Sequence, residues 1–128
     1  NKMPFVRIDM VEGKPETYRK TVGEVVYDAL RSALNAPEND KFIVISEHSP
    51  AEMMISPDYL NIQRSPNCIV IQVTLNAGRT LEMKKAFYHA VAYGLHEKVG
   101  LRLEDVFISL VEVPKENWSF GNGEAQYA

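Results

Sequence analysis

The chain has 128 residues, 45% hydrophobic and 24% charged, a balance typical of a single globular domain. Its net charge of −3 and the lack of a basic run argue against nucleic acid as the main partner. No stretch approaches the roughly 20 apolar residues of a membrane span. The single cysteine, Cys68, cannot form an internal disulfide, so we expect a cytoplasmic protein.

The first third of the chain predicts a strand, a helix and a second strand. Apolar and polar residues interleave over residues 5–12, which is typical of a short strand. A Gly-Lys-Pro turn follows, and apolar residues between Tyr18 and Leu34 then recur at the spacing of an amphipathic helix. Residues 41–46 form an apolar run, and the helical crossover predicts that this strand runs parallel to the first.

Residues 47–66 form the one long irregular stretch, interrupted by Pro50, Pro57 and Pro66. Loops of this length in small domains are often functional or lie at an interface.

The second half predicts the same three elements. Residues 68–73 are rich in β-branched side chains and read as a buried strand. Residues 75–80 form a turn in which Gly78 permits a tight bend and Thr80 can cap a helix that extends to Val99. Arg79 lies beside the free N–H groups at the start of this helix, so the turn predicts an anion site. A last strand is expected over residues 106–113.

A shift of 65 positions overlays the two halves without a gap. Gly13 falls on Gly78, Lys14 on Arg79, and Asp40 on Asp105. We therefore predict one domain over residues 1–128, with an internal repeat of 4–48 and 69–113 and a tail over 114–128.

The expected fold class is α/β, an α+β two-layer sandwich of two tandem β-α-β units. Its four-stranded mixed sheet carries two helices on one face, and a dimer or trimer would cover the other face. Periodicity alone does not separate this fold from a ferredoxin-like arrangement with the same element order.

The tail belongs to neither repeat and places Trp118, Phe120 and Tyr127 among glycines. Exposed apolar groups of this kind mark an interface or a ligand wall. Two interpretations stay open: the aromatics pack on the domain's own sheet, or they reach a neighbouring subunit.

Four short motifs, in order along the chain, resemble the tautomerase superfamily. They are residues 3–7 (MPFVR), 39–40 (ND), 76–80 (NAGRT) and 117–123 (NWSFGNG). The similarity is strongest to the branch related to malonate semialdehyde decarboxylase and to 4-oxalocrotonate tautomerase-like proteins. It implies a homotrimer, active sites near subunit boundaries, and chemistry on an amino-terminal proline.

The resemblance also implies residue roles. Pro4 matches the catalytic proline, Asp40 an aspartate that positions or activates water, and Arg79 an arginine that binds the substrate carboxylate. Trp118, Phe120 and Tyr127 match the aromatic wall of the pocket. The chain departs from the decarboxylase at Ala77, where that enzyme has a second arginine, and this weakens the transfer of decarboxylation.

The expected function is a cofactor-independent keto–enol tautomerase acting on a small 2-keto acid such as an arylpyruvate. An amino-terminal proline is a secondary amine with a pKa of about 8, so it can act as general base and acid near neutral pH. Arg79 would hold the substrate carboxylate, and the scheme needs no metal or cofactor. Two alternatives stay open: a decarboxylase or hydratase of the malonate semialdehyde type, and a catalytically silent trimeric binding module.

This chemistry depends on the first three residues. We expect the natural chain to begin at Met3 and to lose it, which makes Pro4 the amino terminus. If Asn1 and Lys2 are native and retained, Pro4 is an amide nitrogen and cannot act as a base.

Overall fold

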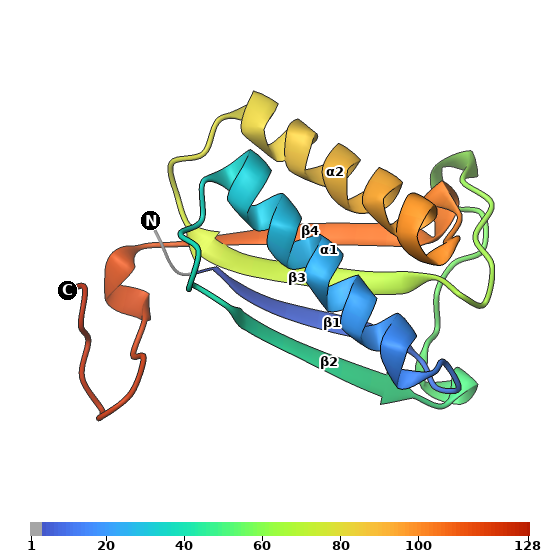
Figure 1. Cartoon of the computed structure of the whole chain (residues 1–128), viewed down its shortest axis with the longest axis horizontal. Coiled ribbons are helices and arrows are strands. Elements are labelled where there is room, and N and C mark those ends of the chain that lie inside the picture. Colours follow the sequence, from blue (N-terminus) through green and yellow to red (C-terminus); the bar gives the residue numbers. More distant parts are fainter. Residues whose placement is uncertain (1–3) are drawn as a thin grey trace.

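The computed structural model describes residues 4–128. Two units of the same type follow one another along the chain (Figure 1). The first comprises β1 (Phe5–Val11), α1 (Glu16–Leu34) and β2 (Phe42–His48), and the second comprises β3 (Ile69–Asn76), α2 (Leu81–Val99) and β4 (Val106–Val113). Short 3₁₀ turns lie at Pro50–Glu52, Tyr59–Asn61, Leu103–Asp105 and Lys115–Asn117.

The four strands form one mixed sheet in the order β2-β1-β3-β4. The two strands within each unit pair in parallel, and the two units join through an antiparallel pairing of β1 with β3. The predicted fold class is therefore confirmed. Because β1 and β2 are direct neighbours, each β-α-β unit is unsplit, and the ferredoxin-like alternative is wrong.

Both helices cover the same face of the sheet (Figure 1). Alternate strand residues point toward them and are buried, as a half-buried strand requires. The helices pack closely, since a Cβ atom added to Gly94 of α2 would lie 2.8 Å from Cγ1 of Val25 in α1. The core comprises Val6, Ile8, Met10, Val22, Val26, Leu30, Leu34, Ile69, Ile71, Val73, Leu75, Phe87, Val91 and Leu95, among others.

Two strands are longer than the sequence predicts. β2 continues through Glu47 and His48, because these residues pair with Met10 and Val11, and the His48 ring lies 2.6 Å from the Asp9 carboxylate. β3 continues through Asn76, which pairs with Val113 of β4. Ladder pairing thus overrides the local turn signals that place both segments in loops.

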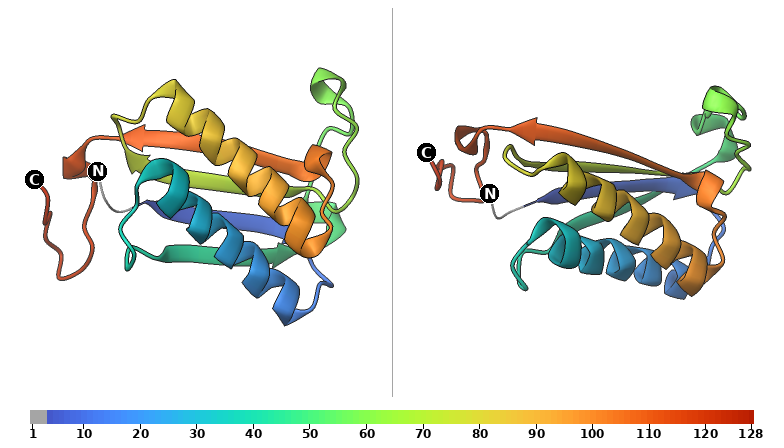
Figure 2. Two further views of the ribbon diagram at one scale, coloured as in Figure 1. Left: turned by 45° about the horizontal axis from the view of Figure 1, so that its top comes forward. Right: turned by 90° about the horizontal axis from the view of Figure 1, so that it is seen from above.

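Within residues 4–128, no helix or strand covers the face of the sheet opposite α1 and α2 (Figure 2). It presents half-exposed apolar side chains such as Val44 and Phe107 between polar ones such as Arg7 and Gln72. Figure 2 shows the connection from β2 to β3 at one end of this sheet and the carboxyl-terminal tail at the other.

Candidate active site

Six chain segments meet at one end of the sheet, the end from which the tail departs (Figure 1). β1 and β2 begin there, because Phe5 pairs with Phe42. β3 and β4 end there, because Phe5 pairs with Thr74 and Asn76 pairs with Val113. The last turn of α1 and the first turn of α2 lie at the same end. The topology thus gathers Pro4, Asp40, Arg79 and Trp118, which lie far apart in sequence.

Pro4 directly precedes β1 and is buried. Asp40 precedes β2, is half-buried, and has a buried Oδ2 atom. Its backbone N–H donates to the Pro37 carbonyl in the turn that follows α1. The prediction about Asn1, Lys2 and Met3 concerns residues outside those that the structure describes.

Arg79 lies in the turn between β3 and α2, as predicted. Gly78 has a φ of 128°, a left-handed conformation that only glycine adopts easily. The Arg79 guanidinium turns inward: Nε and Nη2 donate to the Leu34 carbonyl at 3.3 and 3.2 Å, and Nη1 donates to the Asn76 carbonyl at 3.1 Å. Burial lowers the pKa of Arg79 below its ordinary value, and the charge of Glu112 opposes this shift.

A hollow of about 310 Å³ opens beside this guanidinium. Its described lining comprises Leu34, Asn35, Pro37, Ala77, Gly78, Arg79 and Met83. The predicted cap is confirmed, because Thr80 Oγ1 accepts the backbone N–H of Met83 at 3.2 Å. The first turn of α2 therefore places positive potential next to the Arg79 charge, and the hollow suits a carboxylate.

The tail aromatics form one connected cluster. The rings of Trp118 and Phe120 stack with centroids 5.4 Å apart and an interplanar angle of 11°. Tyr127 meets Phe120 edge-on at 5.3 Å, and Phe120 lies 6.2 Å from Phe42 at the start of β2. The first of the two interpretations of the tail is thus confirmed for Phe120, which packs on its own sheet. Tyr127 is 42% exposed at the rim of the cluster.

Two residues that sequence reasoning did not assign hold this cluster in place. Asn76, at the end of β3, accepts the indole N–H of Trp118 on its Oδ1 at 2.7 Å. Gln126 accepts the backbone N–H of Phe120 at 2.9 Å and donates to the Gly121 carbonyl at 2.8 Å, which closes the tail into a loop. Asn76 opens one of the four motifs and could have been suspected, whereas no local pattern marks Gln126.

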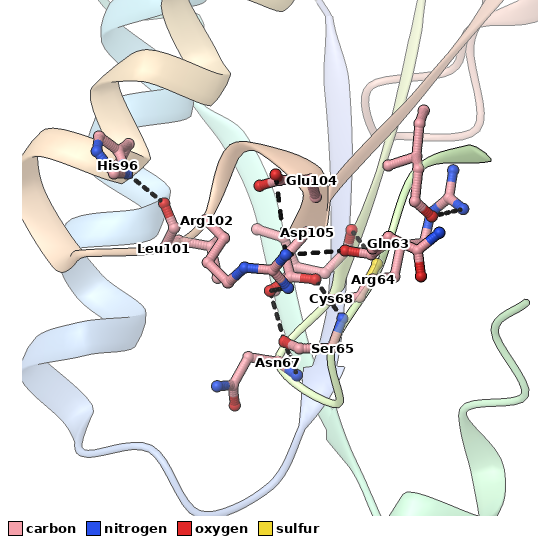
Figure 3. A network of polar contacts seen from close by, with 12 residues as sticks. Gln63, Arg64, Ser65, Asn67, Cys68, His96, Leu101, Arg102, Glu104 and Asp105 are labelled. Carbon is pink, nitrogen blue, oxygen red and sulfur yellow. Dashed lines mark hydrogen bonds and ion pairs between the residues drawn. The ribbon is translucent and has the colours of Figure 1, made fainter. Parts of the chain in front are cut away.

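The opposite end of the sheet carries a polar network around one buried carboxylate (Figure 3). Asp105 is 1% exposed and accepts the backbone N–H of Ser65 at 2.7 Å and its hydroxyl at 2.5 Å. Arg102 lies 3.6 Å from the same carboxylate and donates to the Gln63 carbonyl at 3.0 Å. Burial, and secondly the charge of Asp105, raise the pKa of the Cys68 thiol. This network ties the β2–β3 connection to the start of β4.

Within residues 4–128, no group of three His, Cys, Asp or Glu side chains forms a candidate metal cluster. Neither helix of this part of the chain has the length and apolarity that a membrane crossing demands.

Comparison with known proteins agrees with this geometry. A family model described as "Tautomerase enzyme" matches residues 40–121, and a second model with the same description matches residues 4–62. The chain belongs to the tautomerase family. The probable tautomerase YusQ of Bacillus subtilis is 40% identical to it over 97% of this chain and 98% of its own length. These similarities identify the protein as an enzyme of the isomerase class.

Solved tautomerase-family structures share its fold. FG41 malonate semialdehyde decarboxylase, inhibited by 3-bromopropiolate, is 35% identical and superimposes with a TM-score of 0.88 over 96% of this chain and 93% of that one. A symmetric trimer of fused 4-OT superimposes with a TM-score of 0.79 at 21% identity, over 96% of this chain and 97% of that one. At that identity, the second similarity shows the fold alone.

Proposed function

We propose that this tautomerase interconverts the keto and enol forms of a small 2-keto acid that carries a ring, such as an arylpyruvate. One observation carries the proposal: a cation beside a helix start, a proline at the start of β1 and an aromatic cluster converge on one end of the sheet. In such a substrate, the carboxylate would match the cation, the acidic C–H group would match the proline, and the ring would match the aromatic cluster.

In the proposed mechanism, Pro4 is the amino-terminal residue and its neutral ring nitrogen is the general base. It removes a proton from the carbon next to the ketone. The electron pair of that C–H bond forms the carbon–carbon double bond of the enol, and the π pair of the C=O bond moves to the oxygen. The protonated amine then returns the proton to that oxygen, so the net change is an isomerisation. The burial of Pro4 would favour the neutral amine at neutral pH.

Arg79 holds the substrate carboxylate in this scheme. Three of its N–H groups are directed to backbone carbonyls, and these contacts fix the plane of the guanidinium before substrate arrives. A fixed cation orients the substrate without a further loss of side-chain freedom. Trp118, Phe120 and Tyr127 provide the apolar wall for the ring.

A second candidate is a decarboxylase or hydratase of the malonate semialdehyde type. The similarity to the FG41 decarboxylase favours it, as does Asp40, which precedes β2 at the end of the sheet where Pro4 precedes β1. Ala77 in place of a second arginine counts against it. Carbon dioxide release from 3-oxopropanoate measures this activity directly.

We further infer a homotrimer in the cytoplasm. The uncovered sheet face with half-exposed Val44 and Phe107 gives copies of the chain an apolar surface to share. The similar fold of fused 4-OT, solved as a symmetric trimer, supports this arrangement. Light scattering measures the mass of the assembly.

The proposed reaction is tested with a chain that starts at Pro4. Mixed with phenylenolpyruvate, it should speed the loss of the enol absorbance. Pro4→Ala, and a chain that retains Met3 before Pro4, should each lose about 10²- to 10⁴-fold in rate, the range typical of general-base catalysis. Equal rates for all three chains would exclude the mechanism. No acceleration by any chain would favour the silent binding module.

A further inference from the structure

Asn76 contacts both halves of the proposed site. Its side-chain Oδ1 accepts the Trp118 indole N–H at 2.7 Å, and its backbone carbonyl accepts Arg79 Nη1 at 3.1 Å. The residue is 5% exposed, and it is the last residue of β3. One residue thus links the aromatic cluster to the cation.

The backbone at Asn76 is firmly held. It pairs with Val113 in the parallel ladder, and its neighbour Leu75 is fully buried. The next residue, Ala77, donates its N–H to the Val113 carbonyl at 3.2 Å. A residue held in this way can serve as a fixed reference for the two side chains that it binds.

The bond from Trp118 fixes the direction of the aromatic wall. A half-buried indole N–H needs an acceptor, and without Asn76 the ring would gain its hydrogen bond by turning toward water. The flat face of Trp118 stacks on Phe120, which in turn contacts Phe42 and Tyr127. A rotation of the indole would therefore disturb every ring of the cluster.

We propose that Asn76 is a positioning residue that sets the separation between the Arg79 guanidinium and the Trp118 ring. This separation selects carboxylates whose ring lies at a matching distance from the carboxylate carbon, such as arylpyruvates, over short 2-keto acids. The inference rests on the proposed function, since it assumes that Arg79 and Trp118 contact one substrate.

The first test uses the fact that Trp118 is the only tryptophan in the chain. A ¹⁵N-labelled protein gives one indole N–H resonance, which reports this hydrogen bond without any ligand. Asn76→Leu removes the acceptor at similar size and should move the resonance. Asn76→Asp keeps an acceptor oxygen and should retain a hydrogen-bonded shift. Asn117→Leu makes the same chemical change at the exposed neighbour of Trp118 and should leave the resonance in place.

The second test measures selectivity by calorimetry, with phenylpyruvate and pyruvate as ligands. Asn76→Leu should raise the Kd of phenylpyruvate about threefold to tenfold, as expected for the loss of one hydrogen bond, and change that of pyruvate less than twofold. Trp118→Phe keeps a stacking ring but lacks the N–H. It should produce a similar shift, and the double variant should add little to either single change.

The outcomes separate this inference from the proposed function. Equal weakening of both ligands would show that Asn76 acts only on structure, and an unchanged phenylpyruvate Kd with a moved indole resonance would show that the bond has no role in selection. Either result overturns the inference. Because calorimetry needs no turnover, a protein that binds phenylpyruvate selectively but does not isomerise it would refute the function and leave the inference intact.

Discussion

The two ends of the sheet are built from corresponding positions of the repeat but differ in their chemistry. At the tail end, Asp40 precedes β2 and Arg79 follows β3. At the opposite end, Asp105 precedes β4 and Lys14 follows β1. The two glycine turns also have similar backbone conformations, since Gly13 and Gly78 have φ values of 113° and 128°. The repeat thus supplies the same framework twice.

The side chains at the two ends have different partners. Asp105 is buried and bonded to Ser65, whereas Asp40 is half-buried in the turn between α1 and β2. Lys14 lies with its ammonium 5.3 Å over the Tyr18 ring at the surface, whereas Arg79 points inward to the Leu34 carbonyl. One end is organised around a hollow and a cation, and the other is organised to hold a long connection. Duplication fixes the scaffold, and the segments added at each end decide what it does.

Among changes at corresponding positions of the two ends, the removal of the Arg79 charge should have the largest effect on activity. Arg79→Met should lower kcat/KM for phenylenolpyruvate about 10²-fold, because a charged hydrogen-bonded contact to the substrate is worth two or more kcal/mol. The matched change at the corresponding position, Lys14→Met, should leave kcat/KM within about twofold. Steady-state kinetics of both variants makes the comparison. Equal losses would show that the two ends are not functionally different.

The two aspartates should separate stability from activity. Asp105→Ala should lower the free energy of unfolding by about 2–4 kcal/mol, because it removes a buried carboxylate and leaves two half-buried donors of Ser65 without their acceptor. The exposed neighbour is the control, and Glu104→Ala should cost less than about 0.5 kcal/mol. Urea denaturation measures both. Asp40→Asn should lower kcat and leave the urea midpoint of unfolding close to that of the wild type. A lowered midpoint with an unchanged kcat would assign Asp40 to the scaffold.

Much of the scaffold could be predicted from the sequence, because its signals are local. Gly78 and Thr80 mark the turn and the helix start, and the apolar spacing from Tyr18 to Leu34 marks the first helix. The resemblance of four motifs implied a substrate-binding role for Arg79 in that turn. The strand ends at His48 and Asn76 could not be predicted, because pairing across the sheet sets them and no nearby residue does.

The fine structure of the site depends on contacts between distant residues. The hydrogen bond between Asn76 and Trp118 joins positions 42 apart. The hydrogen bonds of Gln126 to Phe120 and Gly121 depend on the path of the tail. The inward turn of Arg79 depends on a carbonyl of α1, 45 positions away. Side-chain type alone gives no hint of such partners, since an arginine after a glycine is usually solvated.

The two helical glycines offer a smaller test of how tightly the units pack. Gly94→Ala should cost about 1–3 kcal/mol, because its Cβ would lie 2.8 Å from Val25 and the helices would have to separate. Gly23→Ala meets only the end of the Ile45 side chain, at 3.4 Å, and should stabilise the protein by up to about 1 kcal/mol through helix propensity. Thermal unfolding of both variants measures these changes. A shift of Tm in the same direction for both would contradict the prediction.

The smallest expected effect concerns pH and the end that holds the long connection. Burial raises the pKa of the Cys68 thiol, so the folded protein retains this proton at a pH where the unfolded chain has lost it. The stabilisation is fully present at pH values well below the unfolded pKa of about 8.5, where half of the unfolded thiols are ionised, and it is lost as pH rises through the folded-state pKa. The unfolding midpoint of the wild type should therefore fall more steeply between pH 8 and 10 than that of Cys68→Ala. Parallel curves would mean that the thiol ionises as freely in the folded protein as in the unfolded one, and that the network around Asp105 is open to water.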